Sequence, residues 1–112
     1  MKLVTDNRPG VIEVAIQGRF DAHTVGPYIT EVTERIDADH ATVVIDLGGV
    51  DFIDSSALAA LVTTLKRTLE YGGDVVLSRV SPSAHIILEL TRLDEVFTRS
   101  DAVSGPLRNL TA

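Results

Sequence analysis

The chain has 112 residues, 45% of them hydrophobic, and its 10 basic and 16 acidic side chains give a formal net charge of −6. The length suits one domain, and the acidic balance argues against unaided binding to nucleic acid or to an anionic membrane surface. The absence of cysteine excludes disulfides, thiol catalysis and thiolate metal sites. We therefore expect a single domain over residues 1–112.

The beginning of the chain has no apolar signal-peptide core, because Asp6, Asn7 and Arg8 interrupt it. Apolar runs such as residues 57–62 are far shorter than the roughly 20 residues that a bilayer requires. We expect a cytoplasmic protein without membrane insertion.

The first half of the chain predicts two strands, a helix and a third strand. Residues 3–5 and 11–17 flank a turn-forming segment and predict a hairpin, in which Ile12, Val14 and Ile16 share one face. The helix is predicted from apolar residues at helical spacing, namely Val25, Ile29, Val32 and Ile36. Thr24 is its predicted N-cap. Residues 42–47 form a β-branched run that is typical of a central strand.

The second half repeats the alternation of helix and strand. A loop that contains Gly48 and Gly49 is followed by a predicted helix that ends at Gly72-Gly73. Its apolar stripe consists of Leu58, Leu61, Val62, Leu65 and Leu69. A strand over residues 74–78, a helix over 82–93 and a short strand over 96–97 follow, and the second of these helices should turn Ile86, Ile87, Leu90 and Leu93 inward. This order predicts an α/β fold: a mixed, mostly parallel sheet of about four to five strands packed with three to four helices.

Conventional catalytic motifs are missing from the sequence. There is no nucleophile elbow, phosphate-binding glycine loop or zinc-binding helix motif, and His23, His40 and His85 lack metal-ligand spacing. Asp21, His23 and Ser55 are the residue types of a hydrolase triad, but nothing positions an oxyanion hole beside them. We therefore expect no catalytic residue, no metal and no cofactor, and we do not expect an enzyme.

Residues 46–58 are the most informative segment. They lead from a buried strand, through a loop, to a helix N-terminus at Asp54, Ser55 and Ser56, all good N-cap residues. Capping alone would account for such residues in most proteins. However, two adjacent hydroxyls exceed what one cap needs, and the carboxyl end of a strand is where α/β proteins usually place their working surface. A helix N-terminus also favours negative charge, so Ser55 would accept a phosphoryl group without melting the helix.

Three segments of the chain resemble one known family. Residues 50–58, Val-Asp-Phe-Ile-Asp-Ser-Ser-Ala-Leu, are similar to the signature of STAS domains, in particular of the bacterial anti-sigma factor antagonists. Residues 18–24 are similar to the stretch that follows the family's second strand, and residues 72–77, followed by Ser81-Pro82, match a later strand–helix unit. The resemblance covers nearly the whole chain, with the elements in the family's order.

The resemblance implies a switch controlled by phosphorylation. The unphosphorylated antagonist would bind an anti-sigma factor that is itself an ATP-dependent serine kinase, and would thereby free the sigma factor for transcription. Phosphorylation at Ser55 would end this binding, and a phosphatase would reverse it. The family pattern places the partner-binding residues at Asp21, Asp54, Ser55, Ser56 and Ala57.

The chain departs from the family pattern at two places. Ala57 stands where the family usually has Gly; Ala is the better helix former by about 1 kcal/mol, and a kinase that needs close backbone approach would find it a poorer substrate. Gly105-Pro106 interrupts the region in which relatives carry a final helix.

Two other functions remain open from the sequence. A STAS scaffold or accessory subunit of a stress-signalling or lipid-transport complex would use Ser55 and Ser56 only as caps and docking atoms, and a hydrolase would use Ser55 as its nucleophile. Residues 1–56 carry 4 basic and 10 acidic side chains, 4 − 10 = −6, whereas residues 57–112 carry 6 of each. This acidic half suggests a docking surface to which a partner with basic residues is steered.

Overall fold

The computed structural model describes residues 1–99, which form one five-stranded sheet in the order β1-β2-β3-β4-β5. The strands are β1 (Lys2–Arg8), β2 (Gly10–Phe20), β3 (His40–Ile53), β4 (Asp74–Val80) and β5 (Thr98–Arg99). β1 is antiparallel to β2, and the other neighbours are parallel. This confirms the predicted mixed, mostly parallel α/β sheet.

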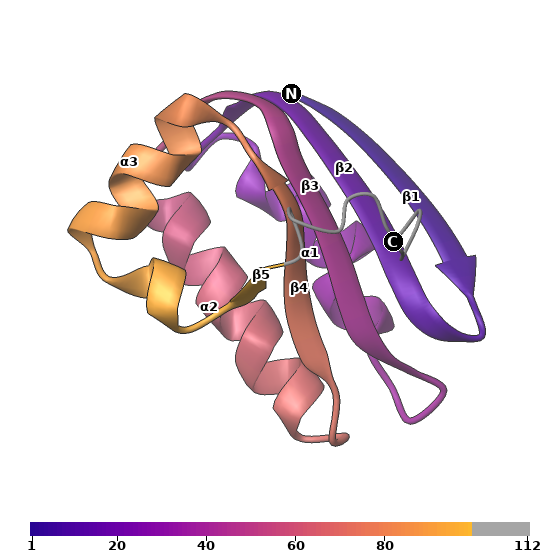
Figure 1. Cartoon of the computed structure of the whole chain (residues 1–112). Helices are drawn as coiled ribbons and strands as arrows, with labels where there is room; N and C mark the ends of the chain where they lie inside the picture. The colour runs from indigo at the N-terminus through magenta and orange to yellow at the C-terminus, as the bar shows by residue number, and fades with distance from the viewer. Residues whose placement is uncertain (100–112) are drawn as a thin grey trace.

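Three α-helices connect the parallel strands: α1 (Val25–Glu31), α2 (Ser55–Leu69) and α3 (Pro82–Leu90). Because the strands follow one another in chain order and such crossovers are right-handed, all three helices lie on one face of the sheet (Figure 1). The core lies between them and the sheet. The predicted inward face of β2 is confirmed, since Ile12, Val14 and Ile16 are buried.

The predicted glycine loop after the third strand is wrong. β3 continues through Gly48 and Gly49 to Ile53, and Asp54 alone separates it from α2. The strand persists because Val50 and Ile53 are buried and because this part of β3 still pairs with β2, with shifts in register on the way. The informative segment is thus a strand end that leads directly into a helix.

The predicted helix over residues 25–36 is only partly confirmed. α1 ends at Glu31, and a 3-10 turn, η1 (Thr33–Arg35), follows it. In this turn the Thr33 hydroxyl lies 2.9 Å from Thr64 Oγ1, which is itself 2.7 Å from the Tyr28 hydroxyl, and all three residues are buried. The apolar spacing therefore identified the buried face, but not the tighter turn that brings a threonine hydroxyl into the core.

The last helix is shorter and rotated relative to the prediction. α3 ends at Leu90, and the 3-10 turn η2 (Leu93–Glu95) replaces its expected last turn. Ala84 and Leu88 are buried. Of the four residues predicted to face inward, Ile87 and Leu93 are partly buried against the core, whereas Ile86 and Leu90 are 59% and 75% exposed. The rotation was hidden because α3 is apolar on more than one side. The predicted strand over residues 96–97 lies at Thr98–Arg99 instead, and Gly105-Pro106 is outside the described residues.

Candidate functional site

The loop after β2 and the N-terminus of α2 lie side by side, and Asp54 joins them. Its Oδ1 accepts the backbone N–H of Ala57 at 3.0 Å, so Asp54 is the N-cap of α2. Its Oδ2 accepts the backbone N–H of Ala22, also at 3.0 Å, across 32 residues of sequence. One carboxylate therefore starts the helix and fixes the neighbouring loop, and the predicted cap is confirmed.

Asp21 lies in this loop and is only 5% exposed. Its Oδ1 accepts the His23 backbone N–H at 3.0 Å, and its Oδ2 accepts Arg19 Nε at 3.2 Å. Burial works against ionisation, but these bonds and the charge of Arg19 outweigh it and lower the pKa of the Asp21 carboxyl. The stabilisation from this pairing is present above the ordinary aspartate pKa and is lost as the pH falls through the lowered value.

Thr24 occupies the predicted N-cap position of α1, but its side chain does not act as a cap. It precedes α1, but its side chain accepts no hydrogen bond from that helix. Instead its hydroxyl accepts the Asp21 backbone N–H at 2.9 Å. Thr24 thus supports the loop that holds Asp21.

Arg19 and Phe52 form a second contact between the two segments, which we call the Arg19–Phe52 pair. The Arg19 guanidinium carbon lies 4.0 Å from the centroid of the Phe52 ring, a cation–π distance. The two residues are opposite each other in the β2–β3 pairing, the Arg19 side chain is 61% exposed, and Phe52 is 39% exposed. This pair was not predicted, because it depends on a register that follows a bulge.

The residues around the expected phosphorylation site differ in exposure. Ser55, the first residue of α2, is exposed, and Ser56 is half-buried. Ala57 is fully buried, so its side chain cannot contact a partner and can affect the surface only through the packing of α2. The structure therefore brings together Asp21, Asp54, Ser55, Ser56 and Ala57, but Ser55 is the exposed member of the group.

The possible hydrolase triad has no support in the hydrogen bonds of this region. Asp21 is bonded to the backbone of His23 rather than to its imidazole ring. Within residues 1–99 no three His, Asp or Glu side chains are grouped so that they could hold a metal ion. In the same residues, no helix is long and apolar enough to cross a membrane.

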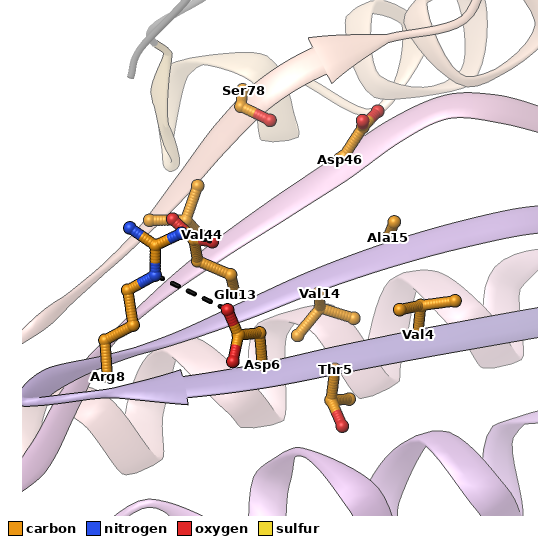
Figure 2. A pocket seen from close by; sticks show the side chains of 10 residues that line it. All are labelled: Val4, Thr5, Asp6, Arg8, Glu13, Val14, Ala15, Val44, Asp46 and Ser78. Carbon is orange, nitrogen blue, oxygen red and sulfur yellow. Dashed lines mark hydrogen bonds and ion pairs between the residues drawn. The ribbon is translucent and has the colours of Figure 1, made fainter. Parts of the chain in front are cut away.

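A hollow lies on the face of the sheet that points away from the three helices, and it is separate from the predicted site. It has a volume of about 460 Å³, and Val4, Ala15 and Val44 line it together with acidic residues (Figure 2). Arg8 pairs with Asp6 and Glu13 at 3.5 and 3.3 Å, and Arg79 pairs with Asp46 at 2.8 Å. Each acidic group of the hollow is thus paired with an arginine, Arg8 serving two of them, and no predicted site residue lines it.

The STAS domain family model matches residues 2–105, so the chain belongs to this family. The putative anti-sigma factor antagonist BtrV of Bordetella bronchiseptica is 26% identical over 97 residues, which cover 87% of this chain and 84% of that protein. The anti-sigma F factor antagonist of Paenibacillus polymyxa is 26% identical over 113 residues, which cover 98% and 95%. The solved structure of the anti-sigma factor antagonist SpoIIAA in its unphosphorylated form shares the fold, with a TM-score of 0.78 at 15% identity over 88% of this chain and 87% of that one.

Replacement of Asp54 by alanine should destabilise the fold more than removal of an ordinary helix cap. We expect Asp54→Ala to lower the free energy of unfolding by about 2 kcal/mol, since the cap and the bond to the β2–α1 loop are both lost. Ser81 is a matched control: it caps α3 through one bond, to Ala84 N at 3.2 Å, and Ser81→Ala should cost about 1 kcal/mol. Urea unfolding of both variants checks this, and equal losses would contradict the bridging role of Asp54.

Proposed function

We propose that this STAS domain is an anti-sigma factor antagonist whose binding is switched off by phosphorylation of Ser55. The observation that carries the proposal is the exposed hydroxyl of Ser55 at the first position of α2, directly after the Asp54 cap. The similarity to proteins named as anti-sigma factor antagonists supports it. The partner is an anti-sigma factor with ATP-dependent serine kinase activity, and a phosphatase restores the unmodified state.

The position of Ser55 suits a residue that is modified and restored without unfolding. A phosphate at the first turn of a helix meets the positive end of the helix dipole and backbone N–H groups that have no partner within the helix. Asp54 keeps the cap in place meanwhile, because both of its oxygens are bonded to backbone N–H groups. Phosphorylation therefore changes the charge of the surface by about two units and leaves the fold intact.

The proposed docking surface consists of Asp21, Asp54, Ser55, Ser56 and Ala57. Ser55 and Ser56 offer atoms to the partner, while Asp54 and the buried Ala57 set the position of the helix end. Asp21 shapes the adjacent loop through its bonds to His23 and Arg19. A phosphate inside this surface disrupts binding at close range, because the partner would have to bury an unpaired charge.

Phosphorylation should occur on one serine only. The protein is incubated with ATP and, one at a time, with the serine-kinase anti-sigma factors of its source organism, and the product is mapped by mass spectrometry. We expect one phosphate on Ser55, none on Ser55→Ala, and one phosphate still on Ser55 in the matched control Ser56→Ala. A phosphate on Ser56, or no phosphate from kinases that modify their own known substrates, would contradict the proposal.

We propose further that the chain works as a single, non-enzymatic domain in the cytoplasm, where sigma factors act. The alternative role, as a scaffold or accessory subunit, makes a different prediction for the protein in its own cells. It would purify as part of a stable large assembly with unmodified Ser55 under all growth conditions. Recovery of a complex with a kinase, lost when Ser55 is phosphorylated, supports the antagonist instead.

A further inference from the structure

We propose that Arg19 is the internal ligand of the phosphate on Ser55, and that phosphorylation draws its guanidinium away from Asp21 and Phe52. This inference rests on the proposed function in that it takes Ser55 as the modified residue. It adds a second consequence of phosphorylation. The modification would rearrange the neighbouring Arg19–Phe52 pair as well as add charge at one serine.

A short chain of contacts connects Arg19 with Ser55. Arg19 Nε lies 3.2 Å from Asp21 Oδ2, and the next residue in the chain, Ala22, donates its N–H to Asp54 Oδ2 at 3.0 Å. Asp54 is the residue before Ser55. On the other side, the guanidinium stacks 4.0 Å from the ring of Phe52, three residues before Ser55. Arg19 is therefore held by both segments that meet at the phosphorylation site.

The guanidinium has unused donors for a new ligand. Within residues 1–99 its bond to Asp21 is through Nε, and its two terminal nitrogens make no hydrogen bond. The side chain is 61% exposed, so it can change its orientation without disturbing the core. A phosphate carries about two negative charges against one on a carboxylate, and planar bidentate binding of phosphate is the favoured geometry of arginine.

The phosphate on Ser55 would compete with Asp21 for the Arg19 guanidinium, and this competition would change the docking surface. When the guanidinium moves toward the phosphate, the Phe52 ring loses its cationic cover and Asp21 loses the charge that neutralises it. A partner that recognises the stacked Arg19–Phe52 pair then meets a bare aromatic ring and an unpaired carboxylate. The docking surface is thus altered beyond the serine itself.

The test installs phosphoserine at position 55 during translation, so that it needs no kinase and stands apart from the test of the proposed function. The second pKa of the phosphate, ordinarily about 6, is followed by phosphorus NMR. In the Arg19→Gln variant this pKa should rise by about half a unit to one unit, the effect of one charge removed from close contact in a water-like dielectric. Arg19→Lys should retain most of the lowering, and Asp21→Asn, which removes the competitor, should lower the pKa further.

Two control variants separate Arg19 from other charges at this end of the sheet. Lys2 lies opposite Gln17 on the far side of β2, so Lys2→Gln removes one positive charge without touching the proposed ligand. His23 contributes a second basic side chain to the same loop, so all measurements are repeated with His23→Gln. The pKa of the phosphate should not change in Lys2→Gln, and the effect of Arg19→Gln should persist without the imidazole.

A direct structural readout completes the test. The Arg19 Nε–H signal of the intact protein should shift when position 55 carries phosphoserine, and the Phe52 ring signals should shift with it. An unchanged phosphate pKa in Arg19→Gln, or an effect of Lys2→Gln as large as that of Arg19→Gln, would overturn the inference. The Arg19 variants lose the stabilisation from the pairing with Asp21 but keep the buried core, and circular dichroism checks that they fold.

Discussion

Replacement of Gly73 by alanine is expected to lower the free energy of unfolding by about 3 kcal/mol or more, the range of severe overpacking. A Cβ atom on Gly73 would lie 1.6 Å from the carbonyl oxygen of Ala41 and 2.3 Å from its carbonyl carbon. Because these atoms belong to the backbone at the beginning of β3, no side-chain rotation can relieve the clash. Equilibrium unfolding in urea measures the loss.

The neighbouring glycine provides the matched control. Gly72 has a φ of +77°, and a Cβ there would meet no atom within 4 Å. Alanine at position 72 therefore costs only the left-handed backbone conformation, about 1 kcal/mol. If Gly72→Ala proved as destabilising as Gly73→Ala, the close approach to Ala41 would not be the cause.

The second large effect is expected in partner binding. Ser55→Asp should weaken binding to the serine-kinase anti-sigma factor about 30-fold or more, because an unpaired charge in an interface costs about 2 kcal/mol or more. Ser55→Ala should retain binding within a few-fold, since it adds no charge. Calorimetric titration of the purified kinase with each variant gives the two affinities.

Stability measurements on the same variants exclude unfolding as the explanation. A carboxylate in the first turn of α2 lies at the favourable end of the helix dipole, so Ser55→Asp should be at least as stable as the unmodified protein. Equal affinities for Ser55→Asp and Ser55→Ala would count against an electrostatic switch. Equal affinities together with confirmed phosphorylation of Ser55 would point instead to a modification without effect on this partner.

The parts of the fold that follow from local pattern were predictable from the sequence. The alternation of Ile12, Val14 and Ile16 identified the buried face of β2, and Asp54 was among the predicted caps of α2. In both cases one physical preference, burial or capping, had no strong competitor. The order of helices and strands followed in the same way and led to the parallel sheet.

The features that were missed depend on packing between distant segments. Gly48 and Gly49 suggested a loop, but pairing with β2 and burial of Val50 and Ile53 keep β3 extended there. α3 has apolar residues on several sides, so periodicity could not determine which of them face the core. At the site, the sequence supplied Asp21 and Ser55, whereas Phe52 contacts Arg19 only through a register shifted by a bulge.

The strand order has a consequence for the way in which the chain is made. Each strand pairs with the strand synthesised before it. Strands can therefore be added to the sheet one after another during translation, and none of them needs a strand that is synthesised much later. Both segments that meet around Ser55, residues 19–24 and 52–58, leave the ribosome before β4 and β5. A nascent chain could therefore assemble the proposed docking surface before β4 and β5 have been synthesised.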